Sequence, residues 1–226
     1  MANQHAFDQV VSRSEESILA TNKVLRNTYA LLSMTLLFSA GTAALAMTMG
    51  LPHPGLIVSL VVMFGGLFAI NALKNSAWAL PVLFAWTGFF GLSVGPMLNM
   101  YLQAFSNGQE LIMMAMGGTG VTFLGLSAYV LTSRKDFSFM GGMLRAGMIV
   151  VILAMIGLMF FPVPAASLAM SAAVVMLMSG FILYDTSNIV QGHQTNYILA
   201  TVGLYLNIYN LFIHLLHLIS AFSGDD

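Results

Sequence analysis

A single acidic side chain lies inside the long apolar segments of this sequence. Asp185 follows Gly-Phe-Ile-Leu-Tyr, and no Lys or Arg lies within two helical turns of it along the chain. An ionisable group in hydrocarbon is costly, and burial without a cation favours the neutral form of a carboxyl group. Asp185 is therefore a candidate proton- or cation-responsive group. The alternative is that it lies at the level of the lipid headgroups, where water hydrates it.

The last apolar segment carries a row of polar residues at helical spacing. Asn207, Asn210, His214 and His217 are separated by three, four and three residues. This spacing puts all four on one face of a helix, and Leu, Ile and Phe fill the other faces. Such a polar stripe either forms hydrogen bonds between helices or lines a water-filled path. A metal site is not expected, because no carboxylate or cysteine accompanies the two histidines.

Two further features have alternative interpretations. Arg145 lies in the first turns of the fifth apolar segment, where its side chain either extends to the cytoplasmic interface or pairs with Asp185. Gly95 and Pro96 interrupt the third segment, and a proline inside a helix removes one backbone hydrogen bond. They serve either ordinary helix packing or a hinge.

Composition bounds the class of protein. Of 226 residues, 58% are hydrophobic and only 7% are charged, whereas a soluble domain carries about 25% charged residues. Lipid must therefore surround most of the chain. The net charge of -1 gives no basic surface for nucleic acid, and the absence of cysteine excludes disulfides and thiol chemistry. No nucleophile–base pair or phosphate-binding loop is visible, so neither an enzyme nor a cofactor is expected.

Seven apolar segments follow a polar stretch of 23 residues, and each is long enough to span a bilayer. They cover residues 24–49, 55–73, 77–102, 111–132, 139–161, 165–190 and 196–222. The sequence predicts an all-α membrane protein with seven transmembrane helices, and the polar stripe predicts that the last helix is central. Residues 1–23 are expected to form a polar tail and residues 24–226 the helical bundle.

The positions of Lys and Arg predict the orientation in the membrane. Basic residues occur in the tail, in the second loop and in the fourth loop, whereas the first, third and fifth loops have none. All basic loops lie on the cytoplasmic side if the N-terminus is cytoplasmic. The C-terminal Asp225 and Asp226 then face the opposite side.

Several motifs in order along the chain resemble the Bax inhibitor-1 family, also called the transmembrane Bax inhibitor motif proteins. They are Val24-Leu-Arg-Asn-Thr-Tyr-Ala-Leu-Leu32, Gly88-Phe-Phe-Gly-Leu-Ser-Val-Gly-Pro96, Arg134-Lys-Asp-Phe-Ser-Phe-Met-Gly-Gly142, Leu183-Tyr-Asp-Thr-Ser-Asn188 and Leu204-Tyr-Leu-Asn-Ile-Tyr-Asn-Leu-Phe212. The resemblance implies a seven-helix fold in which the other helices wrap the last one. It also implies two functional branches.

One branch leaks calcium in a pH-dependent way, with two aspartates on the last two helices sharing a proton. Asp185 matches the first aspartate and Asn207 replaces the second, and the gate arginine of the second helix has no counterpart. A Ca²⁺ or H⁺ leak is therefore the alternative function.

The chain is more similar to the bacterial inner-membrane branch that modulates the AAA protease FtsH. That branch implies engagement of the protease through the cytoplasmic tail, slow degradation, and competition with other substrates.

Overall fold

The computed structural model describes the backbone of residues 2–223 and the side chains of residues 19–223. Within that range it consists of helices, with no strand. The elements are α1 (Ala2–Thr48), α2 (Leu56–Leu73), α3 (Ala79–Ala104), α4 (Gly108–Ser133), the short 3-10 turn η1 (Ser138–Met140), α5 (Gly141–Phe160), α6 (Pro164–Val190) and α7 (Tyr197–Ser223).

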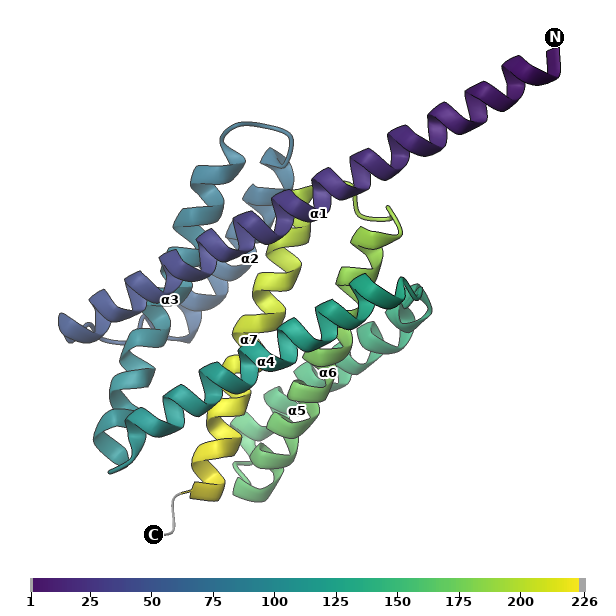
Figure 1. The fold of residues 1–226 in the computed structure, drawn as a ribbon. Helices are drawn as coiled ribbons and strands as arrows, with labels where there is room; N and C mark the ends of the chain where they lie inside the picture. Colours follow the sequence, from purple (N-terminus) through teal and green to yellow (C-terminus); the bar gives the residue numbers. More distant parts are fainter. Residues whose placement is uncertain (1, 224–226) are drawn as a thin grey trace.

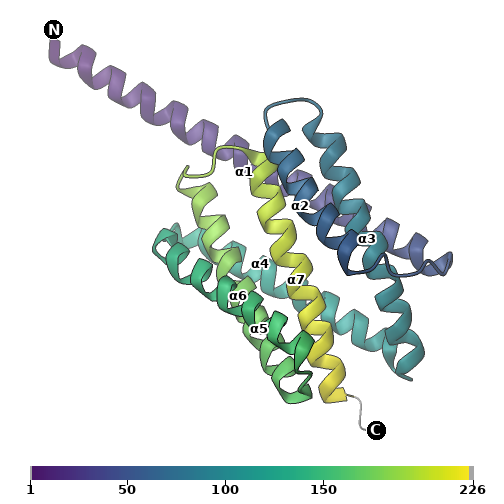
Figure 2. The same ribbon diagram turned by 180° about the vertical axis from the view of Figure 1, so that it is seen from behind.

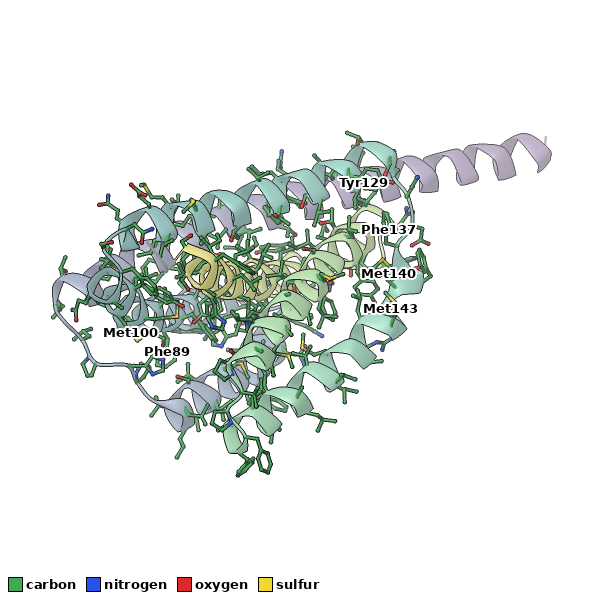
Figure 3. All side chains as sticks on the ribbon, turned by 90° about the horizontal axis from the view of Figure 1, so that it is seen from below. Phe89, Met100, Tyr129, Phe137, Met140 and Met143 are labelled. Atoms are coloured by element: carbon green, nitrogen blue, oxygen red, sulfur yellow. The ribbon has the colours of Figure 1, made fainter. Side chains whose placement is uncertain are left out.

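All seven α-helices are long and apolar enough to cross a membrane, α1 over its part Leu19–Thr48. Each predicted apolar segment coincides with one of them, which confirms the predicted all-α membrane fold. Large apolar side chains face outward around the bundle, among them Met100 and Met143 (Figure 3). In water such a surface would aggregate, but in a bilayer it contacts lipid tails.

The polar stretch at the N-terminus continues α1 as helix from Ala2. This part of α1 projects well beyond the other helices (Figure 1). The side chains of residues 1–18 lie outside the described part of the chain. The predicted division into a tail (1–23) and a bundle (24–226) therefore stays a prediction.

The last helix lies between two groups of helices (Figure 2). Within the described residues, α7 contacts α1, α2, α3, α4 and α6, whereas α5 contacts only η1 and α6. Leu204, Leu211 and Leu216 of α7 are fully buried by these contacts. Because α5 does not reach α7, the predicted central position of the last helix in the bundle stays a prediction.

The tightest helix pair joins α1 to α3 through glycines. A Cβ at Gly91 would overlap the Oγ1 of Thr42 and the carbonyl of Ser39, and one at Gly95 would lie 2.6 Å from the Cβ of Ala46. Small residues at such positions let two helix backbones approach in a membrane. Gly95 therefore serves packing. The helix α3 contains Pro96 and continues to Ala104, so the hinge interpretation stays a prediction.

Close approach of α1 and α3 also satisfies polar groups inside the bundle. The Oγ of Ser39 lies 2.7 Å from the carbonyl oxygen of Thr87 and 2.5 Å from the hydroxyl of Tyr205. That hydroxyl in turn lies 3.2 Å from the same carbonyl oxygen. These bonds form a three-helix junction of α1, α3 and α7.

The connections that carry basic residues meet at one end of the bundle. The Nδ2 of Asn196, before α7, donates to the carbonyl of Lys74 at 3.1 Å. The Nε2 of Gln191, after α6, donates to the carbonyl of Arg134 at 2.9 Å. The second, fourth and sixth connections therefore share a side, as the predicted orientation requires.

We expect Gly91→Ala to lower the thermal stability of the detergent-solubilised protein, by about 1–3 kcal/mol in unfolding free energy for an overpacked contact. The added methyl group would push α1 away from α3. Unfolding can be followed by the fluorescence of Trp86, which is buried. The matched control is Gly117→Ala on α4, where a Cβ meets nothing within 4 Å. Equal stability of the two variants would contradict the close contact.

Candidate functional site

The candidate site lies along the interface of α6 and α7. At the end that carries the basic connections, the Nδ2 of Asn207 on α7 donates a 2.7 Å hydrogen bond to the Oδ2 of Asp185 on α6. Asn207 is only 6% exposed, and Asp185 is half-buried. The structure therefore brings together the two residues that the sequence singled out on different helices. A hydrogen bond of this kind is strong where water is scarce.

A glycine lets the two helices approach at this point. A Cβ at Gly203, one turn before Asn207 on the same face of α7, would lie 3.1 Å from the Oδ2 of Asp185. An added Cβ would be in tight contact with the carboxyl group, which would have to shift slightly. The carboxyl group of Asp185 therefore packs against the backbone of α7 at Gly203.

Both histidines of the stripe contact one hydroxyl group of α6. The Nδ1 of His217 lies 2.8 Å and the Nδ1 of His214 lies 3.0 Å from the Oγ of Ser171. Ser171 is only 2% exposed. Sequence reasoning missed this serine. It precedes Asp185 by fourteen residues, nearly four helical turns, so the same face of α6 carries both.

The stripe is not uniform along its length. The Nδ2 of Asn210 donates to the carbonyl of Leu206 on its own helix at 2.8 Å. Three of the four predicted stripe residues thus reach α6, and Asn210 separates the aspartate pair from the histidine pair. The described residues bring no group of three or more His, Cys, Asp or Glu side chains together as metal ligands.

Arg145 lies away from this interface. Its guanidinium is exposed, and its Nε donates to the carbonyl of Gly141 on the same helix at 2.9 Å. Within the described side chains it does not contact Asp185, whose carboxyl group is bonded to Asn207. In the described side chains Arg145 is thus not paired with Asp185, and its extension to the cytoplasmic interface stays a prediction.

A cavity of about 480 Å³ lies on the other side of α7, among α1, α3 and α4. Its lining is mostly apolar, with the hydroxyl groups of Ser39, Thr119, Tyr205 and Tyr209 as exceptions. Neither Asp185 nor the histidines line it. The polar groups of α7 that could bind or pass a cation or proton are therefore those that face α6.

Comparison with known proteins identifies relatives over the whole length of the chain. The family described as "Inhibitor of apoptosis-promoting Bax1" matches residues 21–224. The chain is 49% identical over 221 residues to the Escherichia coli (strain K12) protein "Modulator of FtsH protease YccA", covering 97% of this chain and 100% of that one.

Two other bacterial relatives are similar over comparable lengths. A membrane protein of Vibrio cholerae is 47% identical, covering 94% of this chain and 96% of the relative. A protein of Campylobacter jejuni is 34% identical, covering 96% and 98%. With a family match across nearly all of the bundle and seven helices that can cross a membrane, this chain belongs to the Bax inhibitor-1 family.

Proposed function

We propose that this protein is not an enzyme but an inner-membrane modulator of the membrane-anchored protease FtsH. The observation that carries the proposal is the 49% identity, over the full length of the relative, to the Escherichia coli modulator. The same relative in another strain bears the name "Inner membrane protein". The N-terminal part of α1 adds a structural reason, because it projects from the bundle (Figure 1).

The projecting part of α1 is the segment that the protease would grip. An AAA protease pulls on an exposed end, so force on residues 2–23 would pass directly along α1 into the bundle. There the packing of α1 against Gly91 and Gly95 of α3 resists extraction. The protease thus binds the chain but degrades it slowly, and other substrates are excluded while the chain occupies the protease.

The basic connections support a cytoplasmic N-terminus. Lys74, Arg134 and Lys135 lie at one end of the bundle, and cytoplasmic loops are enriched in such residues. The helices α2, α4 and α6 end on this side and α7 begins there. Thr28, near the start of the spanning part of α1, lies beside Thr201 in the first turns of α7. This side is the one from which a cytoplasmic protease domain could reach the tail.

Deletion of residues 2–20 should abolish engagement by FtsH, because it removes the segment that the protease would bind. The bundle should still insert into the membrane. The measurement is the rate of degradation by purified FtsH and ATP in proteoliposomes, with inhibition of a second membrane substrate measured alongside. The control removes Asp225 and Asp226 from the other end and should change neither rate. Unchanged degradation and unchanged competition after the tail deletion would refute this role of the tail.

The orientation can be tested separately, because the native chain has no cysteine. Ser106 and Ser133 are exposed residues at the two ends of α4. In intact spheroplasts, a membrane-impermeant maleimide should label Ser106→Cys. It should label Ser133→Cys only after permeabilisation. The reverse pattern would place the tail outside the cytoplasm and exclude its capture by the protease.

A second candidate function is a pH-sensitive Ca²⁺ or H⁺ leak through the bundle. The observation that favours it is the 2.7 Å bond between Asn207 and Asp185 in the bundle interior. A carboxyl group held there can bind a cation or a proton. In the structure the Nδ2 of Asn207 donates to Asp185, and an asparagine has no carboxyl group with which the aspartate could share a proton.

We expect Asn207→Asp to make Ca²⁺ flux into liposomes differ between acid and neutral pH, because two adjacent carboxyl groups would share one proton. Asp185→Ala should remove that dependence. The matched control is Asn210→Asp, which adds a carboxyl group on the same face where the native side chain bonds its own helix. Flux through the native chain that Asp185→Ala changes would favour the leak. Flux equal to that of empty liposomes in every variant would exclude it.

A further inference from the structure

Two imidazole rings share one buried hydroxyl group at the end of α7 opposite the basic connections. The Nδ1 atoms of His217 and His214 lie 2.8 and 3.0 Å from the Oγ of Ser171. Ser171 lies on α6 and both histidines lie on α7, and the serine is almost completely buried. Neither the aspartate pair nor the tail uses these groups.

The number of hydrogens fixes the protonation pattern of the three groups. A serine hydroxyl has one hydrogen, so it can donate to only one of the two Nδ1 atoms. The other Nδ1 must carry its own hydrogen and donate to the serine oxygen. The neutral site therefore requires opposite tautomers: one ring protonated at Nδ1 and the other at Nε2.

The same geometry accommodates one added proton. If the ring that donates to Ser171 is protonated at both nitrogens, its Nδ1–H bond to the serine oxygen is kept and becomes charge-assisted. The serine hydrogen still bonds the other ring. A second added proton would leave both Nδ1 atoms as donors and the serine hydrogen without an acceptor, so the site favours one proton over two.

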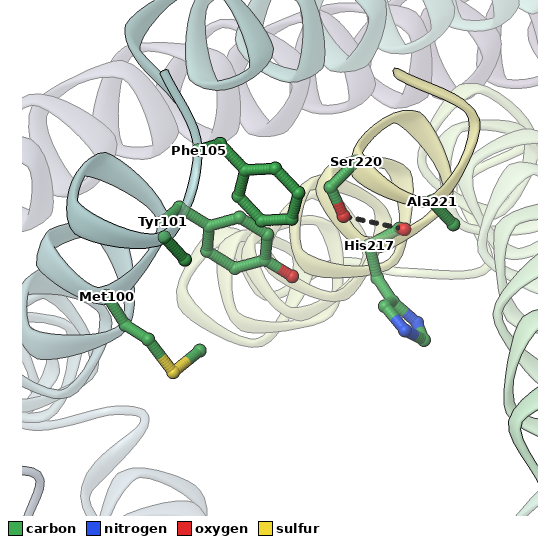
Figure 4. Close-up of a pocket in the computed structure, with 7 residues that line it drawn as sticks. Met100, Tyr101, Phe105, His217, Ser220 and Ala221 are labelled. Carbon is green, nitrogen blue, oxygen red and sulfur yellow. Dashed lines mark hydrogen bonds between the residues drawn. The ribbon is translucent and has the colours of Figure 1, made fainter. Parts of the chain in front are cut away.

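His217 connects this site to a surface pocket. A pocket of about 320 Å³ at the ends of α3 and α7 is lined by Met100, Tyr101, Ala104, Phe105, His217, Ser220 and Ala221. The imidazole of His217 lies across from the rings of Tyr101 and Phe105 (Figure 4). Water in the pocket can therefore reach His217 but not the buried Ser171.

Few other titratable groups surround the site. Tyr101 of α3 lines the same pocket, Tyr209 lies on α7 itself, and Glu110 is exposed in the first turn of α4. No titratable side chain occurs in residues 31–48 of α1, 56–73 of α2, 146–160 of α5 or 164–183 of α6. Of the carboxylates in the described part of the chain, none lies between the two histidines to hold the proton instead.

We propose that Ser171, His214 and His217 form a proton-binding site in which the serine hydroxyl relays one proton between the two rings. His217 takes up the proton from water in the pocket. Its Nδ1–H bond to the serine oxygen then breaks as that hydrogen moves to Oγ, and the original serine hydrogen moves to the Nδ1 of His214. The positive charge passes from the outer ring to the inner ring, and the serine regains its hydroxyl group.

The test is ¹⁵N nuclear magnetic resonance of histidine-labelled protein in lipid nanodiscs across a pH series. His5→Gln, His53→Gln and His193→Gln assign the three rings outside the site and should leave the signals of His214 and His217 unchanged. In the native protein, the signals of His214 and His217 should show opposite tautomers at high pH. On acidification the pair should take up one proton well before the second.

Ser171→Ala should abolish the opposite tautomers and make the two rings titrate independently, and Ser171→Thr, which keeps the hydroxyl group, should restore the native pattern. Trp86 fluorescence reports whether each variant is folded, and the native tautomers test the proposal even if Ser171→Ala does not fold. The same tautomer in both native rings would overturn it. So would a native titration curve that a folded Ser171→Ala variant reproduces.

Discussion

Hydrocarbon offers no hydrogen-bond partner, so a polar side chain inside this bundle requires one within the protein, on its own helix or on a neighbouring one. The junction of Ser39, Thr87 and Tyr205 meets this requirement for three helices at once. It depends on the approach of α1 to α3, which the glycines of α3 permit. Without that approach the hydroxyl group of Ser39 could not reach the carbonyl oxygen of Thr87, and α7 would lose the hydrogen bond between Tyr205 and α1.

The last helix has two polar faces with different partners. Tyr205 bonds to α1 and α3, whereas Asn207, two residues later and therefore on the opposite side of the helix, bonds to Asp185 of α6. On the tyrosine face, Tyr205 bonds to a neutral hydroxyl group and a carbonyl group, and these bonds hold the helix against α1 and α3. The asparagine and histidine face carries both histidines of the helix and bonds to Asp185 and Ser171 of α6.

Much of this arrangement could be predicted from the sequence. Apolar segments separated by prolines, glycines and charges give all seven helices, because only helices satisfy their own backbone in lipid. The spacing of Asn207, Asn210, His214 and His217 places them on one face. Periodicity gives a face but not its partner, so the sequence missed Ser171 and left open whether Arg145 pairs with Asp185. The continuation of α1 to Ala2 was also missed, because residues 1–23 lack the apolar pattern of a spanning segment.

The two proposals, capture of the tail by the protease and proton binding by the serine–histidine site, involve different parts of the bundle. Force on the projecting end of α1 would first load its packing against Gly91 and Gly95 and then the junction at Tyr205. The serine–histidine site lies on the other face of α7, between α6 and α7, at the end remote from the projecting segment. Because the described side chains give that site no hydrogen bond to α1, we expect a change in its protonation to act on the α6–α7 contact and not on the α1–α3 contact. Under the two proposals, resistance to extraction and proton binding would therefore vary independently within the same fold.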